Sequence, residues 1–349
     1  MSDVLTVIDV AAWRRLGEFL LSKGLTDTAQ VQATLLTGGQ SNPTYRLDIG
    51  TQQLVLRKKP VGDLLPSAHA VDREFRVMQA LQGSGVPVPE TLVYSDDLSV
   101  LGTAFYVMRF MKGRVFFDQT LPGMSPQERG AIYRDVNRAI ATLHTIKPDS
   151  VGLGDFGRAG NYFARQINRW GKQYLENHTE PIADLEKLID WLPDRIPASE
   201  EVSIVHGDYR LDNVMLHPTE PRAIAVLDWE LSTLGHPLAD FSYHCMGWHI
   251  PPSLWRGIGG LDLQALGIPS EAEYVSQYVE ATGLKAVQEH WDFYLAYNFF
   301  KIAAILYGIG ERARQGTAAS SDAFEMAAKA APLAEIGWRY AQKYEAGRR

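Results

Sequence analysis

The amino-acid sequence predicts an α+β fold of two lobes, a smaller one rich in β-strands and a larger one that is mainly helical. Short β-prone segments dominate the chain up to residue 108, and helical periodicity dominates after residue 113. With 349 residues, the chain is also long for a single hydrophobic core. We therefore expect lobes at 1–108 and 114–349, joined by a hinge at 109–113.

The first lobe is predicted to begin with one helix and to continue mainly as strands. Apolar side chains recur at helical spacing over 9–23, and Gly24 marks the end of this helix. Alternating apolar residues over 45–49 predict a strand, and the apolar run 54–60 predicts the next one. The loop 37–44 is rich in glycine and small polar residues, which let a backbone approach phosphates closely. The same composition is also typical of an ordinary hairpin turn.

Basic residues mark the end of the strand predicted at 54–60. Because side chains alternate across a strand, Arg57 and Lys59 share one face, where either could pair with the phosphates of a nucleotide. Lys58 belongs to the opposite face, and we expect it to reach solvent at the strand end. The helix predicted next along the chain offers Glu74 as an ion-pair partner for Arg57.

The second lobe is predicted to be mainly helical. Ser125 and Glu128 form a capping-box pattern with a proline between them, which predicts the start of a long helix. The most apolar segment, 293–309, is interrupted by Asn298 and Lys301. These two polar residues favour a buried helix over a membrane span.

Composition narrows the partners and the compartment. A net charge of −7 gives no basic field for nucleic acid or for an anionic membrane, so neither is expected as a partner. The single cysteine, Cys245, excludes an intrachain disulfide and fits a reducing, cytoplasmic location. The first ten residues carry Asp3 and Asp9 in place of a basic flank and a long apolar stretch, so no signal peptide is expected.

The most informative segment is His206-Gly207-Asp208-Tyr209-Arg210-Leu211-Asp212-Asn213, followed later by Leu227-Asp228-Trp229-Glu230. An Asp, an Asn five positions on and a second Asp after an apolar run are typical of phosphoryl-transfer sites. In such sites one carboxylate accepts the proton of the attacking hydroxyl, while amide and carboxylate oxygens hold Mg²⁺. Two short strands joined by a turn would bring Asn213 and Asp228 together at their open ends.

Each of these residues also has an ordinary structural interpretation. Asp and Asn are common in loops because their side chains cap turns, and only the ordered combination favours a functional site. We expect His206 to fix the loop through a backbone hydrogen bond and to take no part in the chemistry. Asp212 stays unassigned, since it could be a solvated loop carboxylate.

Several segments taken together resemble one family. The loop Gly38-Gly39-Gln40-Ser41-Asn42, the pair Arg57 and Glu74, and the segments 206–213, 228–230 and 235–240 are similar to those of the aminoglycoside phosphotransferase-like, choline kinase-related enzymes. The similarity is closest to the subgroup that is also found fused to acyl-CoA dehydrogenase domains. It implies a protein-kinase-like bilobal fold, with a small antiparallel β-sheet in the N-terminal lobe and a mainly helical C-terminal lobe.

The resemblance also implies cofactors and residue roles. ATP, or GTP, would lie between the lobes together with Mg²⁺. Asp208 would be the catalytic base, Asn213 and Asp228 the magnesium ligands, and Asp240 the anchor of the catalytic loop. Arg57 would stand where the family usually has a phosphate-pairing lysine, and residues 108–111 would form the hinge that meets adenine. The nucleotide-binding residues implied are Gly38, Gly39, Ser41, Asn42, Arg57, Lys59, Glu74, Met108, Arg109 and Met111.

The acceptor is expected to be a small molecule with a hydroxyl group. Trp229-Glu230 stands where protein kinases have Phe-Gly, and the stretch up to Asp240 is too short for an activation loop. In the expected acceptor segment, 241–270, Asp262 is the only acid, so a polycationic aminoglycoside is not expected as the natural acceptor. Trp248 and His249 are the candidates for contacting an apolar or mixed acceptor, which by the subgroup resemblance could be a hydroxyacyl-CoA.

Two other functions remain open at this point. One is a catalytically silent nucleotide-binding protein with the same fold. The other is a metallohydrolase that uses His206, Asp208, Asp228, His236 and His244. The sequence predicts no oligomeric state.

Overall fold

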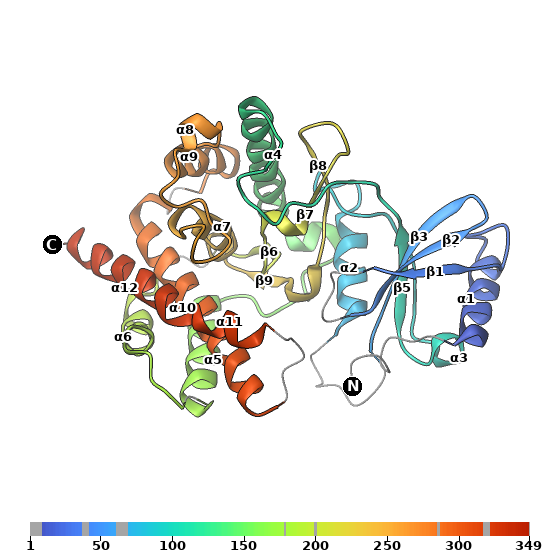
Figure 1. Cartoon of the computed structure of the whole chain (residues 1–349), viewed down its shortest axis with the longest axis horizontal. Coiled ribbons are helices and arrows are strands. Elements are labelled where there is room, and N and C mark those ends of the chain that lie inside the picture. The colour runs from blue at the N-terminus through green and yellow to red at the C-terminus, as the bar shows by residue number, and fades with distance from the viewer. Residues whose placement is uncertain are drawn as a thin grey trace. The chain divides into compact units, whose positions relative to one another are not determined.

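The computed structural model describes residues 9–36, 42–60, 69–177, 179–198, 201–284, 287–316 and 322–348. The chain divides into two compact units (Figure 1). Unit 1 comprises Met1–Gly113 and Ile224–Ser232, and unit 2 comprises Arg114–Ala223 and Thr233–Arg349. The sequence places 224–232 in the helical lobe, whereas the structure groups this segment with the β-rich unit.

Unit 1 is built on a five-stranded antiparallel sheet in the order β1-β2-β3-β5-β4. Its strands are β1 (Gln32–Leu35), β2 (Thr44–Ile49), β3 (Gln52–Lys58), β4 (Thr91–Ser95) and β5 (Phe105–Arg109), and its helices are α1 (Val10–Ser22), α2 (Val71–Leu81) and α3 (Leu98–Leu101). In the register of the sheet, Arg57 on β3 lies opposite Thr44 on β2 and Tyr106 on β5.

The two faces of this sheet have different roles. Leu54 and Leu56 of β3 join a hydrophobic core with residues of α1 and α3, and both side chains are fully buried. Full burial of such a side chain stabilises a fold by about 1.5–3 kcal/mol. Arg57, at the alternate position, lies on the face that α2 covers and pairs there with Glu74. The alternation predicted for this strand is therefore present, and it separates the apolar core from the charged face.

Lys58 departs from its prediction. It does not reach solvent but is only 2% exposed, on the same face as Leu54 and Leu56. Its backbone N–H donates to the carbonyl of Pro43, and its Nζ lies 3.4 Å from the carbonyl oxygen of Lys59. Burial lowers the pKa of Lys58. Strand periodicity gave the correct face, but the depth of cover depends on packing from distant residues.

The segment Ile224–Ser232 belongs to unit 1 because of contacts with the neighbourhood of α2. The N–H of Val226 donates to the carbonyl of Pro87 at 2.8 Å, and Arg73 of α2 donates to the carbonyl of Ser232 at 3.2 Å. The 3₁₀ helix η4 (Trp229–Leu231) packs against α2. Trp229 is 1% exposed, and its indole N–H donates to the carbonyl of Val226. These contacts fix the peptide that carries Asp228 and Glu230.

Unit 2 is mainly helical. Its α-helices are α4 (Pro126–Thr145), α5 (Tyr162–Asn177), α6 (Ala183–Trp191), α7 (Pro237–Cys245), α8 (Leu263–Leu266), α9 (Glu271–Thr282), α10 (Val287–Arg314), α11 (Ala323–Ala328) and α12 (Ala330–Ala346). The 3₁₀ helices are η1 (Pro148–Val151), η2 (Leu192–Arg195), η3 (Leu211–Asn213) and η5 (Met246–His249). Short strands also occur: β6 (Ser203–Val205) pairs with β9 (Thr233–Gly235), and β7 (Val214–Leu216) follows η3. Strand β8 (Ala223–Val226) lies almost entirely in unit 1. The capping box predicted at Ser125 and Glu128 is confirmed at the start of α4.

Helix α10 forms the centre of unit 2. It packs against α5, α7, α11 and α12, which surround it in Figure 1. Its segment Glu289–Arg314 is long and apolar enough to cross a membrane, but 83% of its most apolar window is buried inside the protein. Asn298 donates to the carbonyl of Ala239 and to the hydroxyl of Ser242, both on α7. The helix expected to be buried is therefore a core helix that also holds α7 in place.

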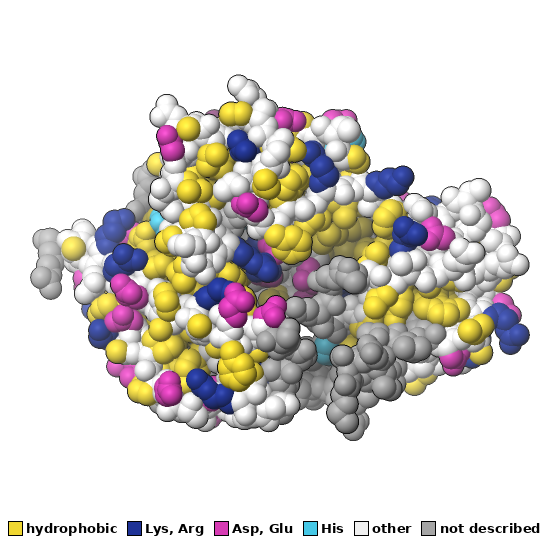
Figure 2. Space-filling view, in the orientation of Figure 1, with side chains coloured by type: hydrophobic (Ala, Val, Ile, Leu, Met, Phe, Trp, Pro, Cys, Tyr) yellow, Lys and Arg dark blue, Asp and Glu magenta, His cyan; other side chains and the backbone are white. Residues whose placement is uncertain are grey.

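Charged side chains are mixed on the surface. On the face drawn in Figure 2, Lys and Arg are interspersed with Asp and Glu, and the described residues of this face show no continuous basic block. This distribution agrees with the net charge of −7.

Candidate active site

The loop that carries Asp208 is anchored by one buried carboxylate. Strand β6 leads directly into His206, and Asp240 on the first turn of α7 accepts hydrogen bonds from the backbone N–H groups of His206 and Gly207 at 2.6 and 2.9 Å. His144 of α4 contacts the same carboxylate at 3.3 Å. Burial alone would raise the pKa of Asp240, but the hydrogen bond and charge of His144 hold it below its usual range. The expected anchoring role of Asp240 is confirmed.

The turn after β6 needs its particular residues. Gly207 has a φ of 86°, a left-handed conformation that glycine adopts without a steric penalty. The Nδ1 atom of His206 accepts a hydrogen bond from the N–H of Asp208 at 3.3 Å, as expected for a loop-fixing histidine. Lys301 of α10 donates to the carbonyl of Gly207 at 3.2 Å. These contacts fix the backbone of Gly207 and Asp208, independently of the contacts that the Asp208 side chain makes.

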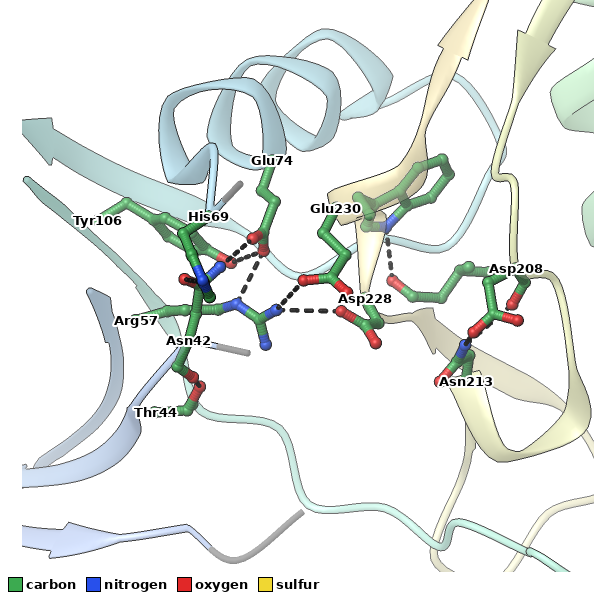
Figure 3. Close-up of polar contacts among 12 residues, drawn as sticks. Asn42, Thr44, Arg57, His69, Glu74, Tyr106, Asp208, Asn213, Asp228 and Glu230 are labelled. Atoms are coloured by element: carbon green, nitrogen blue, oxygen red, sulfur yellow. Dashed lines mark hydrogen bonds and ion pairs between the residues drawn. The ribbon is translucent and has the colours of Figure 1, made fainter. Parts of the chain in front are cut away.

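Three donors surround the carboxylate of Asp208. The hydroxyl of Tyr243 donates to Oδ1 at 2.7 Å, while Arg210 and Asn213 contact Oδ2, each at 3.1 Å. The Nδ2 atom of Asn213 also donates to the carbonyl of Asp208 at 2.9 Å (Figure 3). Because the amide nitrogen of Asn213 is used twice, its Oδ1 remains the atom that can accept or ligate. An amide oxygen of this kind suits a hard cation such as Mg²⁺.

Asp212, which the sequence left unassigned, holds two arginines. Its carboxylate pairs with Arg256 and lies 3.4 Å from Arg210. Its side chain is 10% exposed, so it is not a solvated loop acid. Through Arg210, Asp212 is connected to Asp208.

A small cavity of about 20 Å³ lies within unit 2, and its lining includes Tyr243 and Arg210, which both contact Asp208. Its walls combine two guanidinium groups with aromatic, apolar and neutral polar side chains, and no carboxylate belongs to the lining. The lining residues are Gln119, Arg210, Tyr243, His244, Met246, Gly247, Ile250, Trp255 and Arg256. The guanidinium of Arg256 lies 5.8 Å from the ring centroid of Trp255.

The two proposed acceptor contacts, Trp248 and His249, do not line this cavity. Trp248 is 7% exposed, packs against Tyr274 and donates its indole N–H to the carbonyl of Pro269. His249 is held by Glu271 and Tyr340, at 2.6 Å on each ring nitrogen. Both residues contribute to packing, whereas Trp255 and Arg256 line this cavity.

In unit 1, Arg57 and Glu74 form a buried ion pair of 2.9 Å, which confirms the predicted pairing. Glu74 is 1% exposed and also accepts hydrogen bonds from Asn42 at 2.9 Å and from the hydroxyl of Tyr106 at 3.0 Å (Figure 3). Burial raises the pKa of Glu74 despite the charge of Arg57. Burial alone would lower the pKa of Arg57, but the surrounding negative groups, led by Glu74, raise it, so Arg57 is a permanent cation.

Asp228 also approaches Arg57. Its Oδ1 lies 3.0 Å from Nη2 of Arg57, and a carboxylate oxygen of Glu230 lies 3.8 Å from the same atom (Figure 3). Asp228 has a φ of 64°, a left-handed conformation that Asp tolerates better than most residues. Its side chain is 37% exposed and is therefore accessible to a cation. Unit 1 thus brings a fixed positive charge and two carboxylates together on the α2 face of the sheet.

The remaining residues predicted to contact the nucleotide differ in their surroundings. Gly38, Gly39 and Ser41 lie outside the described residues. Asn42 is fully buried, and its side chain is committed to Glu74 and His69, so it supports the ion pair. Lys59 is 3.8 Å from Asp72, with both side chains partly exposed, and it takes no part in the Glu74 network.

The predicted hinge lies at the end of β5. Met108 is paired within the sheet, and the side chain of Arg109 contacts Glu90 at 3.3 Å. The backbone N–H of Arg109 donates to the carbonyl of Glu90. Met111, two residues further on, has no recorded backbone hydrogen bond within the part of the chain that the structure describes. The same holds for Lys112 and Gly113, whereas the N–H of Phe110 donates to the carbonyl of Gln53.

Sequence reasoning missed the support of Asp208 by Tyr243 and Lys301. A signal existed for Tyr243, because it follows Asp240 by three residues and so lies on the same face of α7. Lys301 was visible as a charge inside an apolar helix. For the metallohydrolase alternative, no group of three or more His, Cys, Asp or Glu residues suited to a metal ion occurs among the described residues. Burial lowers the pKa of both His236 and His244 to about 4.

Comparison with known proteins decides the family. The sequence profile of the phosphotransferase enzyme family matches residues 32–294. The chain belongs to this family. It is 42% identical over 322 residues to acyl-CoA dehydrogenase family member 10 of Mus musculus, covering 92% of this chain and 30% of that protein. It is 41% identical over 329 residues to acyl-CoA dehydrogenase family member 11 of Homo sapiens, covering 94% and 42%. The chain therefore spans less than half the length of these curated relatives.

Solved structures of phosphotransferases share the fold. One, from Ralstonia eutropha and provisionally described as an aminoglycoside phosphotransferase, has a TM-score of 0.87 and 50% identity, covering 97% of this chain and 99% of its own. Another is the aminoglycoside phosphotransferase APH(4)-Ia in complex with AMP-PNP and hygromycin B, with a TM-score of 0.62 and 17% identity, covering 93% and 98%. The predicted kinase-like α+β fold and the enzyme class, a small-molecule kinase, are confirmed.

Proposed function

We propose that this phosphotransferase transfers the γ-phosphoryl group of ATP to a hydroxyl group of a small molecule, with Asp208 as the general base. In this step the acceptor oxygen bonds to the γ-phosphorus, the bond to the β–γ bridging oxygen breaks, and ADP leaves. The acceptor proton passes to the carboxylate of Asp208. The observation that carries the proposal is the fixed carboxylate of Asp208: its loop is anchored by Asp240, and both of its oxygens receive donors, two of which also line a small cavity.

Donor chemistry supports Asn213 and Asp228 as the residues that would hold Mg²⁺. The Oδ1 of Asn213 and the accessible carboxylate of Asp228 are hard oxygen ligands of the type this ion prefers. When bound, the ion would neutralise charge on the transferring phosphoryl group. Asp228 is paired with Arg57 here, so it would be shared between this cation and the metal.

The nucleotide side is supported by three features of unit 1. Arg57 is a permanent cation held by Glu74, which suits contact with the phosphates of ATP. Met111 offers hinge peptide groups of the kind that meet adenine. A protein of the same fold, APH(4)-Ia, binds the ATP analogue AMP-PNP, which makes ATP the first nucleotide to test and GTP the second.

The acceptor is proposed to be a small molecule with a hydroxyl group and an apolar part. A polycationic aminoglycoside would need carboxylates near its amines, whereas the cavity beside Asp208 is lined by Arg210, Arg256 and Trp255 and by no acid. A hydroxyacyl thioester of coenzyme A has the required hydroxyl, an apolar chain and several phosphates. The similarity to acyl-CoA dehydrogenase family members supports this choice.

An acceptor screen tests the proposal. ATP consumption would be measured with hydroxyacyl-CoA species, free hydroxy acids, choline-like alcohols, sugars and aminoglycosides, and each would be repeated with GTP. We expect turnover with hydroxyacyl-CoA and a weaker response to the cationic acceptors. Preferred turnover of an aminoglycoside would contradict the acceptor assignment. Tight ATP binding without phosphoryl transfer to any member of the panel would favour a catalytically silent nucleotide-binding protein.

A further inference from the structure

Helix α7 controls Asp208 at two points. Asp240, in its first turn, accepts the N–H groups of His206 and Gly207 and so fixes the loop backbone. Tyr243 lies three residues later on the same helix, and its hydroxyl donates to Oδ1 of Asp208 at 2.7 Å. One helix therefore holds both the peptide that leads to Asp208 and the carboxylate itself.

The surroundings of Tyr243 keep its hydroxyl as a hydrogen-bond donor to Asp208. Its side chain is 6% exposed, and burial together with the charge of Asp208 raises its pKa well above the usual range. The phenol therefore stays protonated and donates to the carboxylate. Hydrogen bonds from a neutral donor to an ionised acceptor are among the stronger ones in proteins.

A buried lysine supports this arrangement from α10. The Nζ of Lys301 lies 5.0 Å from the ring centroid of Tyr243 and 3.2 Å from the carbonyl oxygen of Gly207. Lys301 is 8% exposed, and a buried ammonium group destabilises a fold unless nearby groups compensate for its lost hydration. Here burial lowers its pKa while the charges of Asp208 and Asp240 oppose that shift.

The position of these contacts on Asp208 matters for chemistry. Oδ1 receives Tyr243, whereas Oδ2 receives Arg210 and Asn213, so the plane of the carboxylate is fixed by donors on both oxygens. Without the donor on Oδ1, the group could rotate about its Cβ–Cγ bond. A general base must present its lone pair to the acceptor hydroxyl within hydrogen-bond reach, so such rotation would reduce the fraction of productive complexes.

We propose that Tyr243 is a positioning residue for phosphoryl transfer: its hydroxyl, supported by Lys301, sets the orientation of the Asp208 carboxylate toward the acceptor. Tyr243 also lines the cavity beside Asp208, so this contact lies at the boundary between the base and the acceptor space. The inference rests on the proposed role of Asp208, and it adds that Asp208 needs Tyr243 for full activity.

The variant Tyr243→Phe tests this directly, because it removes the hydroxyl and keeps the ring. Loss of a charge-assisted hydrogen bond of this strength predicts a kcat lower by about 10- to 100-fold. We expect the KM for ATP to change by less than twofold, because Tyr243 contacts Asp208 and Lys301, which both belong to unit 2. The matched control is Tyr174→Phe, which removes another buried phenol of unit 2, one that accepts the N–H of Ile182 far along the chain from this loop. It should leave kcat unchanged.

A double-mutant cycle tests the part played by Lys301. Lys301→Gln removes the charge over the Tyr243 ring but leaves a side chain able to donate to Gly207. If Lys301 acts through Tyr243, the double variant should have the kcat of Tyr243→Phe alone. Additive losses would overturn the link between the two residues. This comparison still decides the question if either single variant loses some stability, provided that each one retains a cooperative unfolding transition.

Failure of this inference and failure of the proposed function give different results. If Asp208→Asn abolishes turnover but Tyr243→Phe keeps at least half of the wild-type kcat, the positioning role is overturned and the base assignment stands. If Tyr243→Phe lowers kcat, raises the KM for ATP equally and melts well below Tyr174→Phe, its role is structural, which also overturns the inference. Full turnover by Asp208→Asn would instead remove the base assignment itself.

Discussion

Units 1 and 2 each place one buried carboxylate at the centre of their functional residues, but they use it differently. In unit 1, Glu74 forms an ion pair with Arg57 and accepts hydrogen bonds from Asn42 and Tyr106. These contacts fix the position of the Arg57 guanidinium. In unit 2, Asp240 receives backbone N–H groups and so fixes the path of a loop. The difference teaches that the cation Arg57 is positioned by a contact to its own side chain. The carboxylate of Asp208 is positioned first through the backbone of its loop and then through its side chain.

The largest expected effect is that of removing the base. Asp208→Asn keeps the shape of the side chain but cannot accept the proton, so kcat should fall by about 100- to 10,000-fold. ATP affinity, measured by calorimetry, should stay within a few-fold of the wild type. Asp184→Asn, on the distant helix α6, serves as the charge-matched control and should be fully active. Comparable turnover by Asp208→Asn and the control would show that this carboxylate is not the base.

Asp240→Asn should have the next largest effect, because it breaks the backbone anchor. An amide can accept only at its oxygen, and its NH₂ would face one of the two loop N–H groups. We expect the free energy of unfolding to fall by about 3–5 kcal/mol, as for removal of one member of a buried ionic network, with a large loss of kcat. Denaturant titration of the variant provides the measurement. An unchanged unfolding midpoint would mean that the loop does not depend on this carboxylate.

Glu74→Gln tests the other half of the comparison and should act mainly on the nucleotide. Arg57 would lose its main partner but keep Asp228, so we expect the KM for ATP to rise by about 10-fold, corresponding to about 1.4 kcal/mol of binding energy. Asp72→Asn, on the same helix and half-exposed, is the matched control and should leave the KM unchanged. If Glu74→Gln altered only kcat and spared the KM, Arg57 would not serve the nucleotide.

The comparison with the smallest effect at neutral pH distinguishes the units by their stability in acid. Burial lowers the pKa of His236 and His244 to about 4, and both residues lie in unit 2. Between pH 6.5 and 4 the unfolded chain therefore binds more protons than the folded one, so the free energy of unfolding falls as the pH falls. The loss at pH 4 would be about 3 kcal/mol per histidine. His236→Asn keeps an acceptor for the N–H of Leu238 and should make the pH dependence shallower by about one proton.

Equal slopes in the wild type and in His236→Asn over this range would show that this ring does not become protonated on unfolding. Hydrogen exchange measured across the same pH range would add the comparison between units. Amides of unit 2 should lose protection at a higher pH than those of the sheet in unit 1.

Short-range patterns in the sequence predicted much of the site. Alternation along β3, with the acid that the next helix offers, predicted the pairing of Arg57 with Glu74. Asp240 was predicted from its motif, and its bonds to the loop confirm that. Each of these predictions depends on neighbours in the chain or on a recurrent motif.

Long-range packing determined what the sequence did not predict. Lys58 is buried because distant residues cover its strand end, and Trp248 is packed against Tyr274, away from the cavity. The contact of Tyr243 with Asp208 joins residues 35 positions apart. No local periodicity encodes such distances, since they depend on how α7 packs against the loop.

The shared origin of Asp240 and Tyr243 has a consequence for protein engineering. Successive residues of an α-helix are rotated by about 100°, so a single insertion between these two positions would turn one of them away from the loop. A graft of residues 206–213 onto another scaffold would transfer Asp208 without Asp240 and Tyr243, which hold it in position. The unit that can be transplanted is thus discontinuous in sequence. It comprises the loop, the first two turns of α7 and Lys301 of α10, which donates to the loop.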